Sequence, residues 1–269
     1  MINLAYIRLV WRNNRSFTLF SMVFITLFQF MMLYLVTTFN MESILSAVVA
    51  QLPPAMKVFL NDSFFSMLTY EGAAAFGLNH PIVLTLLAIL AVNIPAHHIT
   101  REREEGTIEL LLAHPFRRSH LFLSLWLSGC LILLLVILAA LAGSYVSIVI
   151  FHHLTAPVTI KLLQIGLSLW LLISLIFTYT LMISVFARKG IRAGNLSAVI
   201  TLVLYVLFFI TQIWEAIRFI KPINIFTYYE PQALMVGQGH FLTDVFVLGG
   251  LILICFRIGF RQFERRDMP

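Results

Sequence analysis

Six long apolar runs, separated by short polar segments, most constrain what this chain can fold into. They cover residues 17–39, 82–99, 121–151, 162–187, 193–213 and 241–260. A helix needs about 20 apolar residues to cross a bilayer, so each run is long enough for one span. Only 11% of the 269 residues are charged, whereas soluble domains have about 25%, so no separate soluble domain is expected. The sequence predicts an all-α, polytopic membrane protein with a single domain over residues 1–269.

The positive charges are distributed unevenly between the two sides of the membrane. If the N-terminus lies in the cytoplasm, fourteen of the eighteen Lys and Arg residues fall in cytoplasmic segments. The four on the other side are Lys57, Lys161, Arg218 and Lys221. Because cytoplasmic segments are enriched in Lys and Arg, we predict a protein of the cell membrane with both termini in the cytoplasm. The cations flank apolar runs and form no stripe on a soluble face, so nucleic acid is not an expected partner.

The residues before the first run have an amphipathic pattern. Arg8, Arg12 and Arg15 follow one line at helical spacing, and Trp11 lies among them. The apolar residues near another face are Ile2, Tyr6, Leu9 and Val10. Residues 1–16 therefore predict either an amphipathic helix on the membrane surface or a positively charged flank of the first span.

The second run is preceded by a mixed segment and followed by a proline. Residues 40–80 contain too many apolar residues for a solvated loop, so we expect short helices packed on the outer ends of the spans. Asn93 and Pro95 lie near the inner end of the run. Because proline lacks a backbone donor, Pro95 is expected to kink or end this helix.

Several kinds of chemistry are not indicated by the sequence. None of the four lysines is followed by Ser or Thr, so the chain has no phosphate-binding loop and is not expected to bind ATP itself. The adjacent His97 and His98 would point in different directions on a helix, which favours interfacial histidines over a metal site. Cys130 and Cys255 lie inside apolar runs and predict neither a disulfide nor a metal ligand. We therefore expect no enzyme active site and no cofactor on this chain.

The longest charged interruption is Arg101 to His120, which contains four of the twelve carboxylates. Gly106 is expected to end a helical extension of the second span, because glycine is favoured just past a helix end. Thr107 can cap a short second helix that Pro115 ends. The predicted product is a helix of about two turns along the membrane surface.

This short helix has an apolar face, on which Ile108, Leu111 and Leu112 lie together with Leu110 beside them. Such a face can rest in the lipid interface, or it can fill a hydrophobic groove on a cytoplasmic partner. The acidic cluster favours the partner, because an anionic lipid surface would repel it. Its members are Glu102, Glu104, Glu105 and Glu109.

The same stretch, EREEGTIELLLAHPFRRSHLFLSL, resembles the cytoplasmic segment of ABC-type-2 transporter permeases, which reads roughly E-x-E-x-G-T-x-x-x-L-L-x-x-P-x-x-R. The matching positions are Glu102, Glu104 or Glu105, Gly106, Thr107, Leu111, Leu112, Pro115 and Arg118. INIFTYYEP before the last span and FERRDMP at the end are weaker similarities to the same family. The chain departs from the family at Ser124 and Leu125, where the family often has Gly-Lys; we expect no mechanistic consequence.

The resemblance implies the permease subunit of an ATP-driven exporter. In this family two permeases, identical or paralogous, form the transmembrane pathway, and two separate ATPase subunits bind ATP and Mg²⁺. The segment after the second span is a coupling helix that enters a cleft on the ATPase. By position this role falls on Glu102, Glu104, Glu105, Gly106, Thr107, Ile108, Glu109, Leu110, Leu111 and Leu112. The helix with Arg8, Trp11, Arg12 and Arg15 resembles the connecting helix that braces it.

The cargo is not defined by the sequence. Gln29, Tyr34 and Asn93 are polar residues on the spans that can line a route or form hydrogen bonds between packed helices. Tyr145 and Tyr179 have the same two interpretations. Apolar walls suggest an amphiphilic cargo. The alternative function is a membrane scaffold or accessory subunit that anchors a protein complex, which an ATPase partner would argue against.

Overall fold

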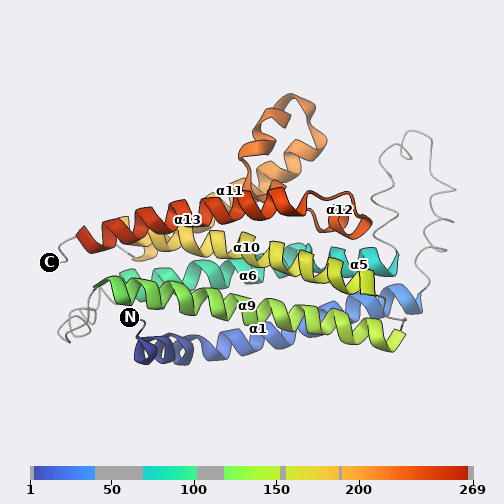
Figure 1. Cartoon of the computed structure of the whole chain (residues 1–269), viewed down its shortest axis with the longest axis horizontal. Helices are drawn as coiled ribbons and strands as arrows, with labels where there is room; N and C mark the ends of the chain where they lie inside the picture. The colour runs from blue at the N-terminus through green and yellow to red at the C-terminus, as the bar shows by residue number, and fades with distance from the viewer. Residues whose placement is uncertain (1–2, 40–68, 102–117, 152–155, 188–189, 266–269) are drawn as a thin grey trace.

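The computed structural model describes residues 3–39, 69–101, 118–151, 156–187 and 190–265. Within these ranges the chain is almost entirely helical and contains no strand. Six helical segments are long and apolar enough to cross a membrane. They lie side by side in an elongated bundle (Figure 1). The predicted all-α protein with six spans is therefore confirmed.

The first helix, α1 (Leu4–Thr38), is longer than predicted. The surface helix expected over residues 1–16 is continuous with the first span and forms no separate element. The reason is local, because no Gly or Pro occurs between residues 4 and 38 to interrupt the helix. At 35 residues α1 is about 50 Å long, more than the roughly 30 Å of the hydrocarbon core. The position of its first turns at the membrane surface stays a prediction.

The second span is built from three pieces. Helix α5 (Tyr70–Leu78) is the described part of the mixed segment and is a short helix, as expected there. Helix α6 (Pro81–Pro95) follows, and a π-helix, η1 (Ala96–Arg101), continues it. Pro95 therefore ends the α-helix as predicted. The preceding part of the mixed segment, 40–68, lies outside the described residues.

Helices α9 (Arg118–Phe151) and α10 (Ala156–Phe186) correspond to the third and fourth spans. Helix α1 packs along α9, and the approach is close at Gly143. A Cβ atom on Gly143 would lie 2.6 Å from the backbone oxygen of Thr26. The Thr26 hydroxyl donates to the Ala139 oxygen at 2.9 Å across the same interface. Small residues with interhelical hydrogen bonds are typical of helix packing in membranes.

Helices α11 (Gly190–Ile213) and α13 (Phe241–Arg265) form the last two spans. Between them lie two 3₁₀-helices, η2 (Glu215–Ile223) and η3 (Ile225–Tyr228), and a short helix, α12 (Pro231–Val236). The link with η2 extends away from the long axis of the bundle (Figure 1), and η2 has no buried residue.

Tyr229 fixes this link to the bundle. Its ring is buried, and its hydroxyl donates to the Leu78 oxygen at the end of α5, at 3.2 Å. Burial raises the pKa of the Tyr229 phenol, so the group remains a neutral donor. Asn224 adds a second anchor, because its amide donates to the Leu204 oxygen at 2.7 Å. The aromatic segment before the last span is thus a structural clamp between α5, α11 and α13.

Candidate functional site

The residues predicted to couple to an ATPase lie outside the described part of the chain. They are Glu102, Glu104, Glu105, Gly106, Thr107, Ile108, Glu109, Leu110, Leu111 and Leu112. The structure describes both flanks of this segment, because η1 ends at Arg101 and α9 begins at Arg118. Both flanks lie at the end of the bundle where α1 begins and α13 ends (Figure 1). The candidate site is therefore the pair of described flanks on the two sides of residues 102–117.

The first flank is a π-helix, which is rare and often found at functional sites. Its cause is Pro95, which cannot donate a backbone hydrogen bond into the preceding turn. The next amide, on Ala96, donates to the backbone oxygens of Asn93 and Val92. The helix therefore continues past Pro95, and it becomes a π-helix from Ala96.

A hydrogen bond joins this π-helix to α1. The Asn14 side-chain amide donates to the Val10 backbone oxygen at 2.8 Å and contacts His98 Nε2 at 3.2 Å. Because the amide nitrogen can only donate, His98 Nε2 is the acceptor in this contact. His98 is 1% exposed, and the ring of Tyr6 meets it edge-on at 6.2 Å between centroids. A part-buried polar pair of this kind links the two helices.

The second flank is also tied to α1. The backbone amide of Asn3 donates to the Ser124 hydroxyl on α9 at 2.8 Å, and Ser124 is fully buried. The Asn3 side chain caps α1 by accepting from the Tyr6 amide at 3.1 Å. The departure from the family at Ser124, which we expected to have no consequence, therefore supplies a contact between α1 and α9.

The first half of α1 thus contacts both flanks of residues 102–117. Its opposite face carries Arg8, Arg12 and Arg15, all of them exposed, while Trp11 is half-buried against the core. Three more exposed arginines lie at the same end, on α13: Arg257, Arg261 and Arg265. The described part of this end is therefore strongly positive. Residues 8–15, which the sequence predicts to brace the coupling helix, therefore belong to a helix that contacts both flanks of residues 102–117.

Asn14, His98 and Ser124 were not predicted as functional residues. One sequence signal could have identified Asn14, because it continues the line of Tyr6 and Val10 at four-residue spacing. Tyr6 and Val10 are buried, so an asparagine on the same line has to find a polar partner. Nothing in the sequence pairs Asn14 with a residue 84 positions away.

The three candidate pathway residues lie in different environments. Gln29 is fully buried, and its amide donates to the Ala74 oxygen at 2.7 Å, so it joins α1 to α5. Tyr34 is exposed beside Phe151, with ring centroids 5.7 Å apart. Asn93 is exposed and lines a groove on the side of the bundle. The structure does not bring these three residues together.

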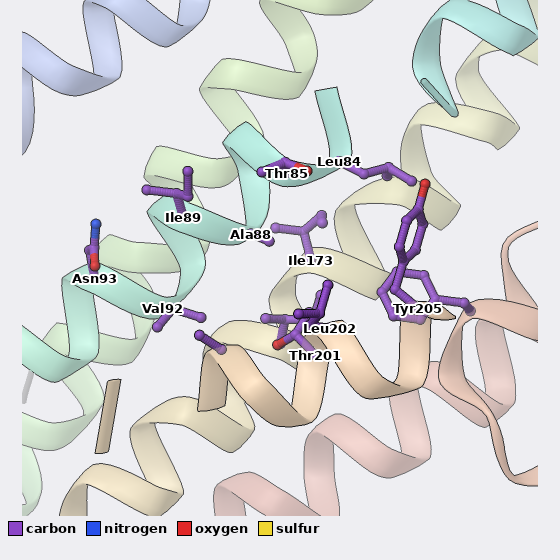
Figure 2. Close-up of a pocket in the computed structure, with 13 residues that line it drawn as sticks. Leu84, Thr85, Ala88, Ile89, Val92, Asn93, Ile173, Thr201, Leu202 and Tyr205 are labelled. Carbon is purple, nitrogen blue, oxygen red and sulfur yellow. The ribbon is translucent and has the colours of Figure 1, made fainter. Parts of the chain in front are cut away.

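The groove next to Asn93 has a volume of about 370 Å³ and is bordered by α6, α10, α11 and η3 (Figure 2). Its lining is mostly aliphatic. The lining residues are Leu84, Thr85, Ala88, Ile89, Val92, Asn93, Ile173, Ile176, Ala198, Thr201, Leu202, Tyr205 and Phe226. Sequence analysis proposed only Asn93 among them, because the other residues look like ordinary span residues until the helices are packed.

Comparison with known protein families identifies a match. A family model described as an ABC-2 family transporter protein matches residues 10–268. No curated protein matches the chain. The matched range includes most of α1, both flanks of residues 102–117, and the groove.

Proposed function

Because this chain belongs to the ABC-2 family of transporter proteins, we propose that it is the permease subunit of an ATP-driven exporter. The observation that carries the coupling part of this proposal is that α1 contacts both described flanks of residues 102–117. One flank is held through His98 and Asn14, and the other through Ser124 and Asn3. If both flanks are fixed to α1, a movement of residues 102–117 is transmitted to the helices of the bundle.

In the proposed mechanism, residues 102–117 form the coupling helix that enters a cleft on a separate ATPase. The ATPase binds ATP and Mg²⁺, since this chain contains no phosphate-binding loop. When ATP draws two ATPase subunits together, the coupling helix moves with them. The π-helix carries this movement into α6, and the first half of α1 keeps α6 and α9 in register.

We propose that the protein lies in the cell membrane. In the proposed orientation, the end of the bundle that adjoins residues 102–117 faces the cytoplasm. Exposed arginines at this end, three on α1 and three on α13, support it because cytoplasmic ends are enriched in positive charge. We further propose that two permeases, identical or paralogous, associate with two ATPase subunits.

A charge reversal in the predicted coupling helix tests this proposal. In Glu105→Lys, the new cation would oppose basic groups on the ATPase, so co-purification of the ATPase from detergent and its stimulated ATP hydrolysis should both fall at least tenfold. A tenfold loss corresponds to about 1.4 kcal/mol, within the range for a charge-assisted contact. The matched control is Glu215→Lys in η2, in the link that extends away from the long axis of the bundle, where the Glu215 side chain is 85% exposed.

A second variant tests the helix itself. Gly106→Pro should uncouple ATP hydrolysis from transport, because it changes the backbone between the two halves of the segment. Full coupled activity in both variants would show that residues 101–120 are only a charged loop. A purified chain that never binds an ATPase would favour the scaffold instead.

A further inference from the structure

The groove between α6 and α11 has features of a binding site for a ligand dissolved in the membrane. It opens on the side of the bundle, where Ile89 and Leu202 are 41% and 61% exposed. Figure 2 shows the lining side chains of α6 and α11 facing each other across it, with Ile173 of α10 behind them. Its volume of about 370 Å³ lies at the low end of the range of about 300–1,000 Å³ for small-molecule sites. One hydrocarbon chain suits this space better than a two-chained lipid.

One polar group in the groove has no partner within the described chain. The Tyr205 hydroxyl is buried and makes no hydrogen bond with the residues that the structure describes. Its ring is held between Phe209 and Phe226, at centroid distances of 5.0 and 5.2 Å, so the hydroxyl is fixed in place. In Figure 2 this oxygen lies on the side of the groove formed by Leu84.

The neighbouring hydroxyls behave differently. Thr201, one turn before Tyr205, donates to the Ser197 oxygen at 2.7 Å and also bonds the Tyr179 hydroxyl. Within a bilayer, water cannot replace a missing partner, and a buried polar group is normally bonded. The Tyr205 hydroxyl is therefore a polar group beside this groove whose hydrogen bond no described residue supplies.

Asn93 provides a second polar group at the other end of the groove (Figure 2). It follows Leu84 by nine residues on α6, which places the two about 13 Å apart along the helix axis. The residues between them on this side of α6 are Thr85, Ala88, Ile89 and Val92. The groove is thus mainly apolar along its length and has a hydrogen-bonding group at each end.

We propose that this groove binds a single-chain amphiphile that enters sideways from the membrane. Its polar head lies at Asn93, its hydrocarbon chain lies between α6 and α11, and a hydrogen-bonding group toward the chain end accepts from or donates to Tyr205. That such a ligand is cargo rests on the proposed function; its binding does not. The two alternatives are that a two-chained membrane lipid fills the groove and that a second copy of the chain covers it.

The test uses the full chain in lipid nanodiscs, without an ATPase, and a diazirine-bearing dodecanoic acid as the label. Dodecanoic acid and 12-hydroxydodecanoic acid compete for labelling. In the unmodified chain the hydroxylated acid should compete about 3- to 10-fold better, the gain of one hydrogen bond. In Tyr205→Phe the two acids should compete equally. Equal competition in the unmodified chain, or an advantage that persists in Tyr205→Phe, would overturn the proposal.

Occlusion variants locate the site independently. Ala88→Phe fills the groove and should lower labelling at least tenfold, whereas Ala142→Phe, at an exposed position on α9, should leave it unchanged. Labelled peptides outside α6, α10 and α11 would contradict the proposal. So would strong labelling of the groove by a diazirine-bearing phosphatidylcholine, or disulfide-linked dimers of Leu202→Cys. Because no ATPase takes part, failure of ATPase capture leaves this result unaffected.

Discussion

Helices α10 and α11 follow each other in the chain and have similar apolar sequences, yet their surroundings differ. In α10, 78% of the central apolar window is buried inside the bundle, whereas in α11 the fraction is 17%. Helix α10 contacts α6, α9, α11 and α13, and the Thr178 hydroxyl on α10 accepts from Trp126 Nε1 at 3.0 Å. Helix α11 shares fewer contacts and leaves Leu196, Val199 and Val203 exposed.

The difference separates two roles within one bundle. The packed helices determine the fold, because their buried side chains contact other helices of the bundle and cannot face lipid. Helix α11 leaves room for lipid or a ligand. The groove lies beside it, and it carries Tyr205, whose hydroxyl has no partner among the described residues. Variants that make the same substitution at a packed and at an open position can test this contrast.

The largest effect is expected for leucine truncation. Leu172→Ala on α10 should lower the free energy of unfolding by about 2 kcal/mol or more, because the fully buried side chain leaves a cavity. Leu196→Ala on α11 should change it by less than about 0.5 kcal/mol, because that side chain is 52% exposed. Equilibrium unfolding in sodium dodecyl sulfate, followed by circular dichroism, measures both. Equal losses would mean that α11 is as tightly packed as α10 in detergent.

A smaller effect is expected from adding a side chain at a glycine. Gly143→Leu should cost about 1–3 kcal/mol, because its Cβ would lie 2.6 Å from the Thr26 backbone oxygen, which cannot move aside without separating α1 from α9. Gly249→Leu on α13 is the matched control, since no atom lies within 4 Å of the added Cβ. Thermal melting in detergent compares the two. A melting temperature for Gly143→Leu equal to that of the control would contradict the close packing of α1 on α9.

The smallest effect on stability is expected for Asn14→Leu, at about 1 kcal/mol, the typical net value of one hydrogen bond. Its effect on coupling should be larger, with ATP hydrolysis in the complex responding less to cargo, because His98 loses its hydrogen bond to α1. Asn13→Leu changes an exposed neighbour and should leave both measurements unchanged. If the two variants behave alike, the pair of Asn14 and His98 does not position residues 102–117.

The sequence by itself determined the six spans and the family. The long uncharged runs predicted membrane helices, and the structure has six helical segments that are long and apolar enough to cross a membrane. The first two, Leu4–Thr38 and Tyr70–Ile99, begin well before the predicted runs. The end of α6 at Pro95 could also be predicted, because the backbone hydrogen bond that a proline cannot form lies within one turn of the same helix. The resemblance at residues 102–118 pointed to the family that the matched range confirms. Each of these signals is local, so neighbouring residues contain all of the information.

Only the tertiary structure decided which polar residues meet. Asn14 bonds His98, 84 residues away, and Asn3 bonds Ser124, 121 residues away. No periodicity in the sequence indicates contacts over such distances. Gln29, a pathway candidate, is a packing residue because its amide bonds α5. Tyr205 lines a groove because residues of α6, α10 and α11 surround the same space. Helix packing depends on the shapes of whole surfaces, so it brings together residues that no local pattern could pair.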